Sequence, residues 1–272
     1  MILDGYHFQY GDFNSRDYNL IFVHGSTESY DSIMGTKTTS SMFNSRDKVR
    51  YIIADNYEES AISFDAEIMT DNATPLTLQA RRVVEKALFN KPHYMKLYVD
   101  IDDDFMSETY EYVDGYLKRL YFNCRFTNPV KIEDGRGLPV GYKFTVECDS
   151  CMAWQDTVEK EFEVSGGDII SVEVDTDIGD YTYPDVTICV GETGGDIMVI
   201  NNSDDAARLT KFNDVSPFSM ITMKGALNYI SGQYYDRFEN QNFIRLLDGE
   251  NMIAVMGDIS SIKFKWNNRR FI

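Results

Sequence analysis

The stretch Gly141-Tyr-Lys-Phe-Thr-Val-Glu-Cys148 alternates apolar and polar side chains with a period of two. Successive side chains of a strand point to opposite faces, so this alternation predicts a half-buried β-strand. Ala61-Ile-Ser-Phe-Asp-Ala-Glu-Ile68 repeats the pattern. The chain is also 14% aromatic, with 18 Tyr and 17 Phe, and aromatic side chains suit pleated, half-buried surfaces. We therefore predict a mainly β protein.

Working outward from these stretches, the first half of the chain contains several more apolar segments. A polar segment, residues 24–47, lies among them, and its β-branched run Thr36-Lys-Thr-Thr39 predicts one arm of an exposed hairpin. A polar hairpin has no core of its own, so we expect this arm to pack on something else. The remaining predicted strands are Tyr18–Val23, Val49–Ala54, Tyr94–Val99 and, as a strand or hairpin around Asp114-Gly115, Thr109–Cys124.

One amphipathic helix is predicted in this half. Thr74 is a candidate N-cap, Pro75 suits the first turn, and Asn90 and Pro92 end the pattern. Steps of three and four place the apolar residues on one face, so we expect the helix to pack on a sheet. These residues are Leu76, Ala80, Val83, Val84, Ala87 and Leu88.

After residue 156 the pattern changes to short strands separated by turns, and no amphipathic helix is predicted. Short strands at this spacing indicate an all-β sandwich, and 272 residues favour two domains. We therefore expect domains at 1–155 and 156–272. The predicted strands are Lys160–Val164, Ile169–Val174, Asp185–Val190, Asp196–Asn201, Arg208–Phe212, Met220–Met223, Asn242–Leu247, Met252–Met256 and Ser261–Trp266, with turns that include Asp248-Gly-Glu-Asn251.

The chain is strongly acidic, with a net charge of −18. Residues 1–155 hold 16 basic and 24 acidic side chains, and residues 156–272 hold 10 and 20, so both halves share the acidity. Such a protein repels nucleic acid and anionic lipid unless a local patch intervenes. The best basic patch closes the chain, and we expect it to be a solvated strand end. Its members are Lys263, Lys265, Arg269 and Arg270.

Membrane and redox signals are weak. No apolar run approaches the roughly 20 residues of a membrane span, and the N-terminus lacks the features of a secretory signal, so we expect a cytosolic origin. Cys148 and Cys151 form a CxxC, but Cys124 and Cys189 stand alone and the flanks predict strands. We expect ordinary reduced thiols, not a metal or redox centre.

No motif for acyl, phosphoryl or hydride transfer is present, and His7, His24 and His93 lie far apart in the sequence. We therefore assign no catalytic, cofactor-binding or metal-binding residues. Two acidic clusters are candidate calcium sites. The first has carboxylates at the first, third, fifth and twelfth positions of a calcium loop but Phe105 where the loop needs glycine, so we expect a solvated loop. The clusters are Asp100, Asp102, Asp104 and Glu111, and Asp175, Asp177 and Asp180.

Several segments occur in an order and spacing that cover nearly the whole chain. They are Phe13-Asn-Ser-Arg-Asp-Tyr-Asn-Leu20, Pro75–Phe89, Cys124-Arg-Phe-Thr-Asn-Pro129, Gly141–Cys148, Met152-Ala-Trp154, Phe243-Ile-Arg-Leu-Leu-Asp-Gly-Glu-Asn251 and Ile262-Lys-Phe264. Together they resemble the distal tail protein (Dit) family of long-tailed, non-contractile bacteriophages.

The resemblance implies that residues 1–155 form a β-sandwich with one helix and an extended hairpin, within 24–50, that clasps the neighbouring subunit. It implies that residues 156–272 form a galectin-like β-sandwich outside a hexameric ring. The homo-hexamer would join the tail tube protein above to the tail-tip hub or lysin protein below, with receptor-binding proteins as further candidate partners. DNA would only pass through the channel, with no membrane contact. The protein would assemble in the host bacterial cytoplasm and reside at the virion tail tip.

Three other functions stay open at this point. A carbohydrate- or receptor-binding module would need an exposed aromatic cluster in the second half, although no galectin-type set of His, Asn, Arg and Trp is present. A tail-tube subunit shares the ring geometry but lacks a second sandwich. A hydrolase would need a deep pocket with perturbed carboxylates. The candidate aromatic residues for a sugar site are Tyr181, Tyr183, Tyr229, Tyr234 and Tyr235.

Overall fold

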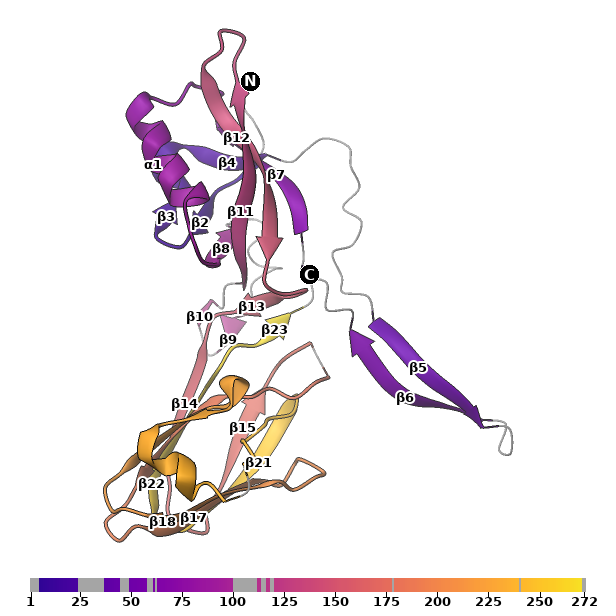
Figure 1. The fold of residues 1–272 in the computed structure, drawn as a ribbon, viewed down its shortest axis with the longest axis vertical. Helices are drawn as coiled ribbons and strands as arrows, with labels where there is room; N and C mark the ends of the chain where they lie inside the picture. The colour runs from indigo at the N-terminus through magenta and orange to yellow at the C-terminus, as the bar shows by residue number, and fades with distance from the viewer. Residues whose placement is uncertain are drawn as a thin grey trace. The chain divides into compact units, whose positions relative to one another are not determined.

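The computed structural model of the chain is mainly β, and its described part contains a single α-helix, as the sequence predicts (Figure 1). The described residues are 5–23, 37–44, 49–57, 61, 63–99, 112–113, 116–117, 120–177, 179–239 and 241–270. The chain forms two compact units, which meet in sequence at Gln155 and Asp156.

The first unit is built on one antiparallel sheet. Its strands follow the order β1-β4-β7-β12-β11-β8-β2-β3, and β13 pairs with the start of β11. The alternating stretch Gly141–Cys148 lies in β12, in the middle of this order. The strands are β1 (Gly5–Tyr6), β2 (Phe8–Tyr10), β3 (Phe13–Asn14), β4 (Leu20–Val23), β7 (Ser63–Thr70), β8 (Met95–Val99), β11 (Leu120–Glu133), β12 (Pro139–Cys148) and β13 (Ala153–Gln155).

This sheet curls round until its ends meet. β1 pairs with β4 and β2 pairs with β8, yet only His7 separates β1 from β2 along the chain. The His7 ring Nδ1 lies 3.0 Å from the carbonyl oxygen of Leu20 on β4. The fully buried ring of Phe8 lies 4.4 Å from that of Phe22. The predicted layers of this unit therefore come from one sheet, because the segment Gly5–Tyr10 pairs with β4 through β1 and with β8 through β2.

Aromatic side chains fill the space inside the curled sheet. The ring of Phe126 stacks on that of Tyr10 at 4.2 Å and lies 4.5 Å from that of Phe144. Phe89 is the last residue of the helix, and its ring centroid lies 5.4 Å from that of Phe144. The buried Tyr10 hydroxyl donates to the carbonyl oxygen of Cys124, so its polar end is satisfied.

The helix α1 (Leu78–Phe89) packs against β11 (Figure 1), and its buried residues Val84 and Leu88 belong to the core cluster of this unit. Its predicted start was wrong. Thr77 is the N-cap, and its hydroxyl accepts a hydrogen bond from the backbone N–H of Ala80 at 3.2 Å. Thr74 precedes the helix, and its carbonyl oxygen accepts from the hydroxyl of Thr70. The predicted end at Asn90 is confirmed, since Asn90 is the C-cap.

The polar segment does contain a hairpin, shifted along the chain from the predicted 24–50. It consists of β5 (Lys37–Asn44) and β6 (Val49–Tyr57), so the predicted strand at Val49–Ala54 is its second arm. Within the described residues this two-stranded sheet pairs with no other strand. The acidic loop prediction at Asp100–Asp104 lies outside the described residues, between β8 and a small hairpin. That hairpin is formed by β9 (Tyr112–Val113) and β10 (Tyr116–Leu117).

The second unit is a two-sheet sandwich around one core. A five-stranded sheet has the order β14-β22-β16-β19-β20, and a four-stranded sheet has the order β15-β21-β17-β18. Inward-facing valine, isoleucine and phenylalanine side chains of both sheets form a single buried cluster. The strands are β14 (Val158–Glu163), β15 (Ile169–Val174), β16 (Asp185–Val190), β17 (Gly195–Asn201), β18 (Leu209–Val215), β19 (Met220–Lys224), β20 (Tyr229–Ile230), β21 (Gly249–Met256), β22 (Ile259–Trp266) and, last in the described chain, β23 (Arg269–Arg270).

Two predictions in this unit were wrong. Residues 242–247 are not a strand; only Leu246 makes an isolated bridge, to Thr182. Phe243 and Ile244 are buried, although the segment that contains them is irregular. Side-chain hydrogen bonds hold this segment in place, including one from the hydroxyl of Thr210 to the carbonyl oxygen of Asn242. Of the turn predicted at 248–251, residues 249–251 are instead the start of β21.

The short 3₁₀ turns of the described residues are η1 (Ser15–Tyr18), η2 (Gly225–Leu227) and η3 (Gly232–Arg237).

The cap assignment leads to a matched prediction. Thr77→Ala removes the side-chain acceptor for the first turn of α1 and should lower the free energy of unfolding by about 1 kcal/mol. Thr74→Ala should leave it within about 0.5 kcal/mol, since only the backbone of Thr74 is used. Urea denaturation followed by circular dichroism measures both. Equal losses for the two variants would contradict the assignment of Thr77 as the cap.

Candidate assembly surfaces

The two sheets of the second unit present different outer faces. On the five-stranded sheet the strand register aligns alternating charges across the strands: Glu159 opposite Lys265, Lys265 opposite Asp185, and Asp185 opposite Lys224. The next row pairs Glu161 with Lys263. Opposite charges directly across an antiparallel pair stabilise it, so this face satisfies its own charges.

The outer face of the four-stranded sheet is apolar. One row crosses all four strands through side chains that are all hydrophobic, and three methionines flank this row. None of these side chains belongs to the buried core cluster, and Ile169 and Met252 are 57% and 37% exposed. We call the set the apolar face. It consists of Ile169, Met198, Ile200, Leu209, Met252, Ala254 and Met256.

Acidic side chains border the apolar face at both ends. Glu173 and Glu250 stand opposite each other at one end. Asp196 lies at the other end, where Lys211 contacts it at 4.0 Å and contacts Glu239 at 2.6 Å. Sequence reasoning missed this face, because its members come together only through the register of the four strands.

A second cluster that the sequence did not predict lies among the loops around β17 and β21. The carboxylate of Asp204, 1% exposed, accepts from Nε of Arg245 at 2.6 Å and from its Nη2 at 2.9 Å. The guanidinium carbon of Arg245 lies 3.6 Å from the ring centroid of Tyr181, a cation–π contact. Asn201 donates to the carbonyl oxygen of Arg245 and to Oδ1 of Asn251. These polar groups satisfy one another, so the cluster fixes the loops.

The five tyrosines weighed as a sugar platform do not lie on one open surface. Tyr234 is 3% exposed, and Tyr181 lies against Arg245. Tyr183, Tyr229 and Tyr235 are exposed, on the loop before β16, on β20 and on η3.

The charged clusters predicted from sequence are paired. Lys263 forms ion pairs with Glu159 and Glu161, and Lys265 lies 4.0 Å from Glu159. The side chain of Arg270, 10% exposed, pairs with Asp175 and with Asp177, the latter at 2.8 Å. Arg269 donates to the carbonyl oxygen of Tyr181. Carboxylates of the same unit therefore pair with Lys263, Lys265 and Arg270, and the expected solvated strand end is wrong for the buried Arg270. Arg270 also pairs with two members of the second acidic cluster, whose third member, Asp180, is exposed.

The cysteines behave as structural residues. Cys124 and Cys148 stand opposite each other in β11 and β12, and both are buried and reduced. Burial is the largest cause that raises the pKa of the Cys124 thiol, so it stays protonated. Cys151 and Cys189 are partly exposed free thiols. The exposed His93 and the partly buried His7 belong to different strand connections, and His24 lies outside the described residues.

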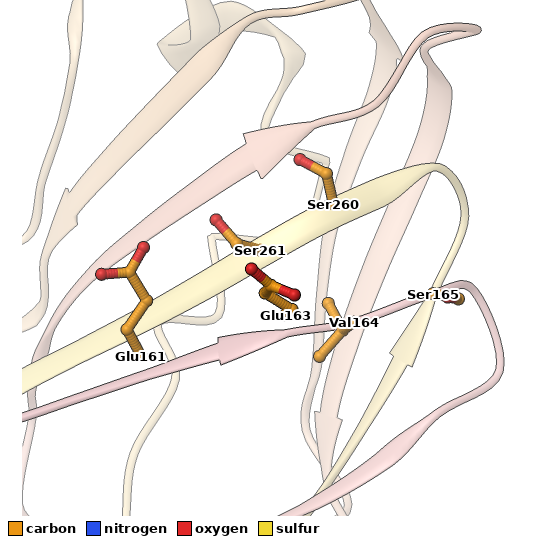
Figure 2. Close-up of a pocket in the computed structure, with 6 residues that line it drawn as sticks. All are labelled: Glu161, Glu163, Val164, Ser165, Ser260 and Ser261. Carbon is orange, nitrogen blue, oxygen red and sulfur yellow. The ribbon is translucent and has the colours of Figure 1, made fainter.

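In the described part of the chain, a metal site and a pocket are the remaining candidates for a chemical site. Among the described residues, no group of three or more His, Cys, Asp and Glu side chains could hold a metal ion. A pocket beside β14 is lined by two carboxylates and three hydroxyls but by no histidine, lysine or cysteine (Figure 2). Its lining residues are Glu161, Glu163, Val164, Ser165, Ser260 and Ser261. In the described part of the chain, no helix has the length and apolar character to cross a membrane.

Comparisons with known proteins match nearly the whole chain. The model of a phage tail protein N-terminal domain matches residues 3–150, and that of a phage tail C-terminal domain matches residues 152–266. No curated protein sequence matches it. The fold is similar to the crystal structure of the Dit protein (gp 19.1) of phage SPP1, described as a paradigm of the hub adsorption apparatus in phages that infect Gram-positive bacteria. The TM-score is 0.60 at 11% identity, over 97% of this chain and 99% of that chain.

A second similar structure is a chain of the phage p2 baseplate in its activated conformation with strontium. It has a TM-score of 0.52 at 11% identity, over 98% of this chain and 99% of that chain. The similarity covers nearly all of both chains in each case, so the two units occur together in these structures as they do here. At this identity the similarity concerns the fold.

Breaking the buried ion pair should destabilise the second unit strongly. Arg245→Met leaves the carboxylate of Asp204 buried without its cation, which typically costs about 3–5 kcal/mol. Lys224→Met is the matched control, since this exposed cation on β19 loses only a cross-strand pairing with Asp185 and should cost at most about 1 kcal/mol. Urea denaturation monitored by tryptophan fluorescence measures both. A loss for Arg245→Met no larger than the control's would contradict a stabilising role for the pair.

The same pair predicts a pH dependence. Hydrogen bonds from Arg245 lower the pKa of Asp204 in the folded chain. A lowered folded-state pKa contributes stability above the unfolded-state value of about 3.9, and this contribution is lost as the pH falls through the folded-state pKa. Asp204→Asn should therefore be less stable than the natural chain at neutral pH but lose less stability on acidification. Urea denaturation across a pH series tests this, and equal acid-induced losses would contradict it.

Proposed function

The chain belongs to the family of phage tail proteins whose N- and C-terminal domain models match it, and from this we propose that it is a structural distal tail protein. The observation that carries the proposal is the combination of both family domains with a Dit-like fold over 97% of the chain. We infer that six copies form a ring at the distal end of the tail, which joins the tail tube to the tail-tip hub. The protein would assemble in the host cytoplasm and remain in the virion.

The ring needs an interface between neighbouring copies, and the β5–β6 hairpin supports one. A two-stranded hairpin is at best marginally stable alone in water, and among the described residues this one pairs with no other strand. Its sequence contains several apolar residues, including Met42, Phe43, Tyr51, Ile52 and Ile53. Contact with the next copy would cover them, and such a head-to-tail contact closes into a ring when the rotation is right.

The net charge of −18 supports a channel that DNA crosses without binding. Like charge repels the phosphate backbone, so an acidic channel wall would let the genome pass. In this proposal the partners are other tail proteins: the tail tube protein, the hub protein and receptor-binding proteins. Neither a membrane nor a cofactor is required.

A non-enzymatic role fits the polar clusters described above. The carboxylates with bonded partners stabilise loops or strand rows, and no histidine or lysine that could activate a serine lines the pocket of Figure 2. The alternative of a carbohydrate- or receptor-binding module has weaker support, because the candidate tyrosines do not form one stacking surface.

Removal of the hairpin should abolish the ring. We expect the full chain to form a particle of about 188 kDa, six times the 31.3 kDa subunit, and to show six-fold rings by negative-stain microscopy. A variant with Lys37–Tyr57 replaced by a short Gly-Ser linker should stay at the subunit mass, because the clasp is missing. Multi-angle light scattering at micromolar concentration measures both.

The control is a variant in which a Gly-Ser linker of the same length replaces residues 45–48, between β5 and β6, and both strands are kept. It should still form rings. Thermal unfolding by circular dichroism verifies that the hairpin-less variant is folded. A folded variant that still forms six-fold rings would refute the clasp, and a full-length chain that stays monomeric with and without the tail tube protein would refute the ring.

A further inference from the structure

The apolar face departs from the usual pattern of a sandwich. A strand with one solvated face alternates apolar and polar residues, whereas a strand buried on both faces is a continuous apolar run. The two central strands of the four-stranded sheet contain such runs, Ile197-Met-Val-Ile200 in β17 and Met252-Ile-Ala-Val-Met256 in β21. The central strands of the five-stranded sheet place mainly polar side chains on their outer side instead, with Lys, Thr, Asp and Ser among them and only Cys189 and Met220 at one end.

The edge strands complete the pattern. Their outer side chains become polar away from the central row, with Ser171 and Glu173 on β15 and Lys211 and Asn213 on β18. The result is an apolar centre with a polar rim, which is the anatomy of a protein interface. Methionines contribute three of the seven side chains, and their flexible thioethers adapt to a partner surface.

From these features we infer that the apolar face is a docking surface for a different tail protein that presents an apolar patch rimmed by Lys or Arg. The charge of the rim selects this occupant. Four acidic side chains border the face: Glu173, Glu250, Asp196 and Glu239. The basic side chain described there, Lys211, already forms ion pairs with Asp196 and Glu239. A second copy would bring the same acids against these four, and like-charge contacts are unfavourable.

The inference deepens the proposed function, because it names the surface by which a tail protein would be held. It predicts that the face is open in the purified chain and covered in the tail. Methionine reports this directly, since exposed methionine is oxidised to the sulfoxide by peroxide while covered methionine is protected. In that step one peroxide oxygen is transferred to sulfur, the peroxide is reduced to water, and no other bond of the side chain changes.

The experiment compares the full chain free in solution with the chain in tails isolated from phage particles. Both are treated with dilute hydrogen peroxide and analysed by peptide mass spectrometry. Met198, Met252 and Met256 should react in the free chain and lose that reactivity in tails. Met220, 61% exposed on the outer side of the five-stranded sheet, provides the internal comparison and should react in both.

Two matched pairs of variants test the chemistry. Ile200→Lys, in the centre of the apolar face, should abolish protection, whereas Thr187→Lys, in the centre of the other outer face, should not. Glu250→Lys should weaken protection of Met252 by reversing a rim charge, whereas Glu161→Lys should not. Protection that is insensitive to Glu250→Lys would overturn the basic character assigned to the partner.

The remaining outcomes are distinguishable. A chain that is present in tails with all three methionines as reactive as in solution would overturn the docking surface and leave the proposed function standing. Protection that already develops in the purified chain as its concentration rises would assign the face to a second copy and overturn the occupant. Absence of the chain from tails would overturn both proposals.

Discussion

Each residue of a strand has only two directions for its side chain, and this constraint governs the whole molecule. A sheet that buries one face must find cover for it, and the two units solve this differently. The second unit places two sheets face to face around one core. The first has a single main sheet, so residues 5–10 connect its edges, and the curled sheet with α1 encloses the aromatic core. The edge strands that remain, β1 and β3, have two residues each, so they offer little backbone for pairing with other chains.

The sequence predicts the parts of this fold that rest on local alternation. β15 and β16 begin and end at the predicted residues, because each alternates cleanly between turns. The predicted start of α1 was wrong because Thr74 and Thr77 are both acceptable N-caps. Pro75 suits the first turn of a helix as well as an extended segment before it. The choice between them depends on where the chain leaves the sheet, which local sequence does not contain.

The candidate surfaces depend on long-range geometry and were less predictable. Asp204 and Arg245 are 41 residues apart, and the sequence around each of them does not predict an ion pair. Residues 242–247 have strand-like composition, but Thr210 and Arg208 hydrogen-bond Asn242 and hold the segment in an irregular path. Prediction of the apolar face would have required the register of all four strands. Its continuous apolar runs were visible in the sequence, yet such runs equally suit a strand buried inside the protein itself.

The contrast between the two outer faces of the sandwich separates stability from assembly. The charged rows of the five-stranded sheet are paired within the face, so they stabilise the strands and leave little unsatisfied charge for a partner. The apolar face contributes little to its own unit's core, because its side chains point away from it. Substitutions there should therefore change association more than folding, whereas substitutions at Asp204 or Arg245 should do the reverse. A protein whose role lies in its contacts needs this separation, since a surface that also held the fold together could not be covered and uncovered during assembly without a cost in stability.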